Sequence, residues 1–420
     1  MVRRLPFARA GRRALIRYLL RWSGLGAMVG VLAGLSSFVF LEGLDRVTAA
    51  RLEHGWLIWW LPAAGLAIGL SQRYLGGRAR GGTLLVLDEI QRPTVDIPRR
   101  MAPLVLVGTW ITHLFGGSAG REGTALQLSA SLTDLLGRAV GRSGQDRRRL
   151  AITAVGGGFG AVFGVPLAGA VFALEVRALG AARLRAVMPV LVAALVGHGV
   201  VQGLGHHHPL RPRLDASLSP LTLIKLAVAA GAFALAAVLF VELTQAVRAA
   251  VTRCCRWSPL RPALGGALVV ALATIFGRDY LGLSLPLIER GLGGDRLSVA
   301  VVALKLVFTA ITLGSGFPGG EVTPLFVIGT TLGAALAIPL QLDITLVAAV
   351  GFVAVFAGAA HTPLAGAMMG VELFGRNAAL PVGLVCFLTS QLARRLGRHG
   401  GIYPRSNGDG PLNPGGATGR

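Results

Sequence analysis

A single glutamate stands in a glycine-rich stretch between two apolar segments. Residues 116–124 read Gly-Gly-Ser-Ala-Gly-Arg-Glu-Gly-Thr, and an apolar run follows from Ala125 to Leu136. Glycine destabilises the middle of a helix, so we expect the chain to break here and a helix to begin near Glu122. The free N–H groups at such a helix start bind anions, and a carboxylate is itself an anion. The pattern predicts a carboxylate that occupies an anion site when charged and leaves it when protonated.

The composition places this stretch in a membrane. The chain has 420 residues, of which 53% are hydrophobic and only 14% charged, whereas a soluble chain carries about a quarter charged residues. Repeated apolar stretches of about 20 residues predict an all-α polytopic membrane protein in the cell (inner) membrane. The net charge of +22 comes almost entirely from arginines outside the apolar runs. This distribution favours membrane orientation and contact with the lipid bilayer over nucleic-acid binding.

The apolar runs predict the membrane segments. Arginines at positions 9, 13, 17 and 21 share one helical stripe, so residues 1–21 are expected to form an amphipathic segment at the cytoplasmic surface. A membrane helix is predicted from about Trp22 to Leu41, with the N-terminus cytoplasmic. We expect further apolar segments at Trp56–Leu70, Gly76–Ile90, Met101–Phe115, Ala151–Val176 (split in two at Pro166), Ala186–Val201, Leu221–Val241, Leu264–Phe276 and Val299–Leu313.

Other clusters of reactive residues predict little chemistry. Histidines 206–208 precede a proline and are expected in an exposed loop rather than at a metal site, because no second ligand cluster is evident. Asp88 and Glu89 are expected at the aqueous end of their short helix. The three cysteines show no metal spacing, so we predict no metal and no cofactor.

The sequence contains an internal repeat. Pro-Leu-Ala-Gly begins at Pro166 and again at Pro363, and each block ends in an acid, Glu175 or Glu372. When two residues are inserted into the alignment of the two repeats, Glu122 aligns with Glu321 and Thr124 aligns with Thr323. Broken segments at matching positions of two repeats indicate a binding site at mid-membrane.

The repeat divides the chain into two membrane halves. They are expected at residues 22–205 and 206–398, followed by a tail at 399–420 that is too short for a regulatory domain. The acids that end the matching blocks, Glu175 and Glu372, are expected to cap neighbouring segments.

The motifs together resemble the CLC family of chloride channels and transporters over about residues 22 to 403. Gly120-Arg121-Glu122-Gly123-Thr124 resembles the family's gating-glutamate motif, and the blocks around residues 166 and 363 resemble its next characteristic segments. Gly401-Ile402-Tyr403 is similar to the place where the family supplies an anion-contacting tyrosine. The resemblance implies inverted halves with discontinuous helices, a homodimer, and an anion path in each subunit.

Three departures from the common CLC pattern resemble the family's fluoride-exporting branch. The usual Gly-Ser-Gly-Ile-Pro stretch is Gly-Gly-Thr-Leu-Leu around Thr83, and the second half reads Gly-Gly-Glu-Val-Thr-Pro over residues 319–324. The position after Glu175, which holds a second glutamate in chloride/proton exchangers, is Val176. The resemblance implies anion contacts at the residues Thr83, Gly120, Arg121, Gly123, Val322, Thr323 and Tyr403.

These observations predict an anion/proton antiporter that exports fluoride in exchange for protons. Glu122 is the expected gate, and Glu321 is the candidate for a further proton or anion site because position 176 lacks an acid. Instead of contacting the anion, Thr323 could cap a helix before Pro324. Tyr403 could instead be a tyrosine at the membrane–water interface. A chloride channel or chloride/proton exchanger is the alternative function, and a non-transporting scaffold a remote one. The sequence shows no nucleophile–base pair, so we do not expect an enzyme.

Overall fold

The computed structural model describes residues 12–91, 96–141, 144–176, 182–209, 212–214 and 219–404. Throughout these ranges the regular structure is helical, and the one β-type pairing is an isolated bridge between Gly120 and Gly320. The expected all-α fold is therefore confirmed.

The helices of the first half vary widely in length. They are α1 (Arg12–Glu53), α2 (Leu61–Ser71), α3 (Gly82–Gln91), α4 (Met101–Leu114), α5 (Glu122–Ala139), α6 (Gln145–Phe163), α7 (Pro166–Glu175) and α8 (Ala182–Gly203). A 3-10 helix (Gly55–Trp60) precedes α2, and a π-turn (Gln72–Gly76) and a second 3-10 helix (Gly77–Gly81) link α2 to α3. The prediction that the first span ends near Leu41 is wrong, because α1 continues without a break to Glu53.

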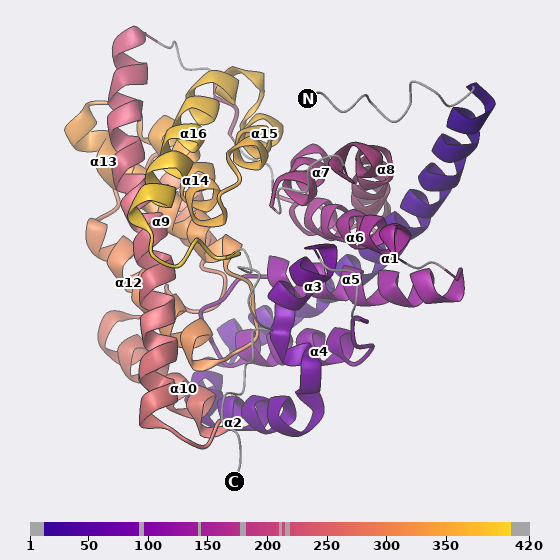
Figure 1. The fold of residues 1–420 in the computed structure, drawn as a ribbon. Helices are drawn as coiled ribbons and strands as arrows, with labels where there is room; N and C mark the ends of the chain where they lie inside the picture. The colour runs from indigo at the N-terminus through magenta and orange to yellow at the C-terminus, as the bar shows by residue number, and fades with distance from the viewer. Residues whose placement is uncertain are drawn as a thin grey trace.

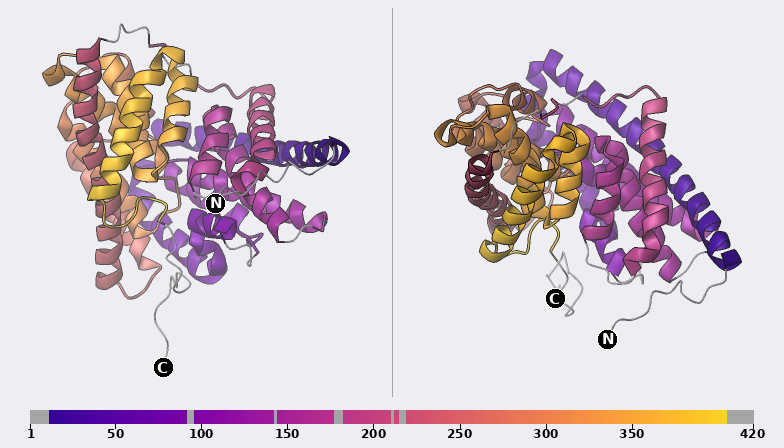
Figure 2. Two further views of the ribbon diagram at one scale, coloured as in Figure 1. Left: turned by 45° about the horizontal axis from the view of Figure 1, so that its top comes forward. Right: turned by 90° about the horizontal axis from the view of Figure 1, so that it is seen from above.

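The second half has a similar series of elements. They are α9 (Pro220–Cys254), α10 (Leu260–Phe276), α11 (Leu285–Leu292), α12 (Val299–Ser315), α13 (Val322–Leu340), α14 (Ile344–Ala360), α15 (Pro363–Phe374), a 3-10 turn (Arg376–Ala378) and α16 (Ala379–Leu396). In Figure 1 α9 and α12 to α16 gather on the left and α3 to α8 on the right. Figure 2 shows α1 at the outer edge of the molecule.

Only some of these helices are long enough to cross a bilayer. Among the described residues, four helical segments combine sufficient length and hydropathy: Ile16–Glu53, Leu184–Gly203, Pro220–Cys254 and Val322–Leu340. The other apolar helices are shorter, which is typical of discontinuous membrane helices. The predicted break at Pro166 is confirmed, since α6 ends at Phe163 and α7 begins at Pro166.

The repeat is visible in the backbone at these breaks. Gly164, between α6 and α7, has a positive φ of 73°, and His361, between α14 and α15, has a φ of 57°. Glycine adopts this conformation without steric cost, whereas histidine does so rarely. The same left-handed turn therefore ends α6 and α14, although only the first position carries a glycine.

The acids at the ends of α7 and α15 join the two halves. Glu372 accepts hydrogen bonds from the backbone N–H groups of Leu167 (2.9 Å) and Ala168 (2.6 Å). Glu175 accepts them from Leu364 (3.0 Å) and Ala365 (2.8 Å). Each carboxylate thus satisfies the free N–H groups at the start of the other helix. This confirms the prediction that both acids cap neighbouring segments.

Candidate anion site

The start of α5 lies against the start of α13 at the interface between the halves. Gly120 and Gly320 exchange two backbone hydrogen bonds, of 2.7 and 2.8 Å, just before the two helices begin. Gly116, ahead of α5, has a φ of 91°, which favours glycine and turns the chain away from α4. The glycine-rich stretch therefore breaks the helix and starts a new one at Glu122, as predicted.

The side chain of Glu122 is fully buried and reaches across to α13. Its Oε2 accepts hydrogen bonds from the N–H of Arg121 (2.9 Å), the N–H of Thr323 (3.3 Å) and the hydroxyl of Thr323 (3.1 Å). Its Oε1 accepts one from the N–H of Val322. A carboxylate therefore occupies the anion-binding position at the N-terminus of a helix from the opposite half.

Two glycines make room for this carboxylate. A Cβ added at Gly120 would lie 2.7 Å from Oε2 of Glu122, and one at Gly320 would collide with Oε1. A third glycine, Gly123, packs against Gly319, Gly320 and the hydroxyl of Thr83. The glycines on both sides of the bridge thus allow polar atoms to approach the backbone closely.

Thr83 brings the start of a third helix to the same place. Its Oγ1 would lie 3.3 Å from a Cβ at Gly123, and it accepts a hydrogen bond of 3.2 Å from Nε2 of Gln127. The starts of α3, α5 and α13 therefore converge. Gln127 is a site residue that the sequence did not single out, although its position one turn after Gly123 offered a signal.

Glu321 occupies a different place from the one that the repeat predicted. The bridge pairs residue 120 with residue 320, so Arg121 corresponds to Glu321 and Glu122 to Val322. The pairings of Glu122 with Glu321 and of Thr124 with Thr323 are wrong by one position. Gly116 and Gly316, which both have a positive φ, stand the same distance before the two helix starts, so the repeat has one more inserted residue than the sequence match suggested. The Glu321 side chain makes no hydrogen bond that caps α13. It interacts electrostatically with Glu122 and Arg248.

Tyr403 is buried beside helix α7. Its residue exposure is 7%, and its ring packs edge-on against Phe172 at a centroid distance of 6.0 Å. Its hydroxyl interacts electrostatically with both Glu321 and Glu122. Burial at this position disagrees with the alternative of an interfacial tyrosine.

A small cavity lies beside Thr323. Arg121, Phe163, His208 and Phe326 are among the residues that line it. The guanidinium of Arg121 lies over the ring of Phe163, 5.6 Å from its centroid. Burial and the nearby Arg121 charge lower the pKa of His208 to about 4, so this wall of the cavity is neutral near pH 7. Among the described residues that line this cavity, Arg121 therefore supplies the positive charge.

A buried lysine supports the segment that leads to Glu122. Nζ of Lys305 lies 2.9 Å from the hydroxyls of Ser118 and Ser284, and 3.0 and 3.2 Å from the carbonyl oxygens of Gly282 and Tyr280. Four acceptors thus surround the three N–H donors of an ammonium group. The sequence gives no sign of this role, because the acceptors come from two separate loops, one before α5 and one between α10 and α11.

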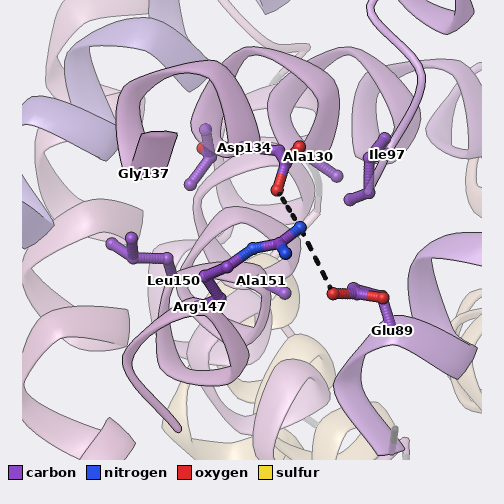
Figure 3. A pocket seen from close by; sticks show the side chains of 9 residues that line it. Glu89, Ile97, Ala130, Asp134, Gly137, Arg147, Leu150 and Ala151 are labelled. Atoms are coloured by element: carbon purple, nitrogen blue, oxygen red, sulfur yellow. Dashed lines mark hydrogen bonds and ion pairs between the residues drawn. The ribbon is translucent and has the colours of Figure 1, made fainter. Parts of the chain in front are cut away.

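An ion-pair cluster lies at the far end of α5 (Figure 3). Arg147 contacts Asp134 at 2.7 Å and Glu89 at 3.4 Å, and the three line a small pocket. Glu89 has an exposure of only 4%, so the prediction that it sits at an aqueous helix end is wrong. Its charge is tolerated because Arg147 compensates it.

Known proteins share this fold and sequence. A family model described as "Voltage gated chloride channel" matches residues 64–394. The chain is 42% identical to a chloride/fluoride channel protein of Pseudomonas syringae pv. tomato, over 94% of this chain and 88% of that protein. It is 26% identical to an H(+)/Cl(-) exchange transporter of Klebsiella pneumoniae, over 89% of this chain and 85% of that one.

Solved structures agree with this relationship. A CLC-type fluoride/proton antiporter superimposes with a TM-score of 0.87 at 34% identity, covering 94% of this chain and 98% of the other. A slow cyanobacterial Cl-/H+ antiporter has a TM-score of 0.76 at 19% identity, covering 91% and 95%, and supports the fold alone. By its matching family model, its sequence and its inverted, discontinuous helices, the chain belongs to the CLC family.

Proposed function

We propose that the protein exports fluoride in exchange for protons, with Glu122 as the exchanging group. The observation that carries the proposal is the Glu122 carboxylate at the start of α13, held by the amides of Val322 and Thr323 and by the Thr323 hydroxyl. These donors bind a negative charge, and they serve a small anion equally well once the carboxylate has left.

Protonation supplies the switch between the two occupants. A neutral carboxyl group loses most of its attraction to the N–H groups and to the helix dipole. Glu122 then leaves with its proton, and fluoride enters the vacated position. When fluoride departs, Glu122 releases the proton on the other side and returns as a carboxylate. Exchange results because the anion and the charged side chain cannot occupy the position together.

The residues around the site support fluoride as the anion. Fluoride is small and costly to dehydrate, so its site must provide several close donors. The glycines at 120, 123 and 320 let backbone N–H groups and hydroxyls approach closely, and Thr83 adds a further hydroxyl beside Gly123. The relative from Pseudomonas is named for chloride and fluoride, and the similar crystal structure is that of a fluoride/proton antiporter.

We also propose the orientation and assembly that the family suggests. The N-terminal arginines support a cytoplasmic start of α1. In this orientation the end of α1 near Glu53 and the loop after α8 face outside. Each subunit of a homodimer in the inner membrane then carries its own anion path. Light scattering of the purified protein, corrected for detergent, is expected to give twice the mass of the chain, and a monomer mass would contradict this assembly.

Anion and proton movement in liposomes tests the function. Purified protein is reconstituted into vesicles loaded with fluoride or chloride, and anion efflux and external pH are recorded together. We expect fluoride to leave much faster than chloride and to drive proton uptake against a proton gradient. Equal or faster chloride efflux would return the protein to the chloride-transporting alternative, and no flux of either anion would favour the scaffold.

A further inference from the structure

Three metal-ligating side chains meet near the end of α1, apart from the anion site. Glu42 and Asp45 are three residues apart and so lie on one face of the helix. His206, in the loop after α8, faces them: its Nδ1 lies 3.5 Å from Oε1 of Glu42 and 3.8 Å from Oδ2 of Asp45. The three ligand atoms all lie within 4.8 Å of one another.

These distances fit the coordination sphere of a zinc ion. Zinc binds imidazole nitrogen and carboxylate oxygen at about 2.0–2.2 Å, which puts two ligands of a tetrahedral site about 3.3 Å apart. The two distances from His206 exceed this value by a few tenths of an ångström, which small side-chain rotations can close. A set of one imidazole and two carboxylates suits divalent first-row transition metals.

Two further histidines lie close to His206. The ring of His208 lies 5.5 Å from that of His206, and the ring of His198 lies 6.1 Å from that of His208. Nδ1 of both His198 and His208 is buried and has no hydrogen-bond partner within the described ranges. Buried polar atoms normally have a partner.

The exposure of the ligands allows an ion to enter. The His206 side chain is 11% exposed and therefore held in place, whereas those of Glu42 and Asp45 are 37% and 61% exposed. Two cations compete with such an ion: the charge of Arg121 acts on Asp45, and Arg46 lies 3.9 Å from Glu42 but is 82% exposed. Such an exposed pair contributes little free energy and is readily replaced by a divalent ion.

We propose that Glu42, Asp45 and His206 bind a divalent transition metal ion such as Zn²⁺, and that the bound ion slows anion transport. The loop after α8 connects the metal site to the proposed anion path, because His208 and Pro209 line the cavity that also contains Arg121. An ion that ties His206 to α1 restrains this wall of the cavity. The regulatory half of the proposal rests on the proposed anion transport, whereas the binding half does not.

Zinc titration of the tag-free protein tests binding. Isothermal calorimetry with ZnCl₂ is expected to show one site per chain in the parent protein and in His207→Ala. His207 is the matched control, because it is adjacent and exposed but lies outside the cluster. His206→Ala is expected to bind zinc at least about tenfold more weakly. No binding by the parent protein, or equal binding by His206→Ala, would overturn the site.

Fluoride efflux from liposomes tests the effect on transport. With zinc on both sides of the membrane, efflux should slow in the parent protein and in His207→Ala but not in His206→Ala or Asp45→Asn. Without zinc all four proteins should transport at the same rate, which shows that the variants fold. Zinc binding without slower efflux would overturn the regulatory half. Absence of fluoride efflux in every protein would contradict the proposed transport, while calorimetry would still decide the metal site.

Discussion

The carboxylate of Glu122 lies 3.1 Å from the hydroxyl of Thr323, although 201 positions separate the two residues in the chain. Each stands at the start of a broken helix, and the helices come from opposite halves. The site therefore exists only when the halves pack together. In the proposed exchange, the Glu122 carboxylate is the group that fluoride displaces.

Thr323→Val is expected to weaken fluoride binding. The substitution preserves the shape of the side chain but removes one donor to the anion, and a hydrogen bond to a charged group contributes about 1.5–3 kcal/mol. Thr331→Val is the matched control, because Thr331 is also buried on α13 but donates only to carbonyl oxygens of its own helix. Fluoride efflux as a function of concentration should show a higher half-saturation value for Thr323→Val alone. Equal values for the two variants would argue against the hydroxyl as an anion contact.

Glu321→Gln is expected to reduce fluoride-driven proton uptake while leaving the protein intact. Glu321 interacts with the charges of Glu122 and Arg248 but does not cap α13, so its removal should cost little stability. Glu321→Ala should therefore also elute intact from size exclusion. Parent rates of proton uptake in both variants would assign Glu321 a structural role only.

Lys305→Met is expected to lower stability and slow transport together. Methionine fills similar space but leaves the carbonyl oxygens of Tyr280 and Gly282 without a donor, at about 1–3 kcal/mol for each unsatisfied group. It also removes one of the hydrogen bonds of Ser118, four residues before Glu122. Lys225→Met, at the only other lysine, is the control. Heating in detergent followed by size exclusion measures the loss, and equal melting of the two variants would contradict this role.

Glu372→Gln is expected to destabilise the contact between α7 and α15. The amide retains one acceptor, but its NH₂ group faces a backbone N–H, so about 1–2 kcal/mol should be lost. Glu175→Gln should have a similar effect, because the two caps are equivalent. The exposed Glu289 provides a control as Glu289→Gln. Parent-like melting of both cap variants would show that the caps do not stabilise the interface.

The features that were predictable from the sequence depend on local chemistry. Glycine and proline determine where helices end, so the start of α5 at Glu122 and the break at Pro166 were expected. The repeat also indicated that Glu175 and Glu372 cap neighbouring segments, though not that each caps the other's helix.

The features that were missed depend on contacts between distant segments. No local pattern shows that Val322 and Thr323 bind the Glu122 carboxylate, or that Lys305 holds Ser118. The one-residue error at Glu321 arose because the number of residues inserted between the repeats was inferred from matching letters, whereas the backbone bridge between Gly120 and Gly320 determines it. The neighbours of His206 were missed for the same reason, since Glu42 lies 164 positions away.

Proton uptake by Glu122→Gln tests whether Glu122 carries the proton. The amide has nearly the same shape as the carboxyl group but carries no titratable proton at working pH. Vesicles containing the parent protein or the variant are loaded with fluoride, and external pH is recorded while fluoride leaves down its gradient. If Glu122 carries the proton, the parent protein moves protons inward against their gradient and Glu122→Gln moves none. Proton uptake by Glu122→Gln that is still driven by fluoride efflux would contradict it, because the proton would then be carried by another group.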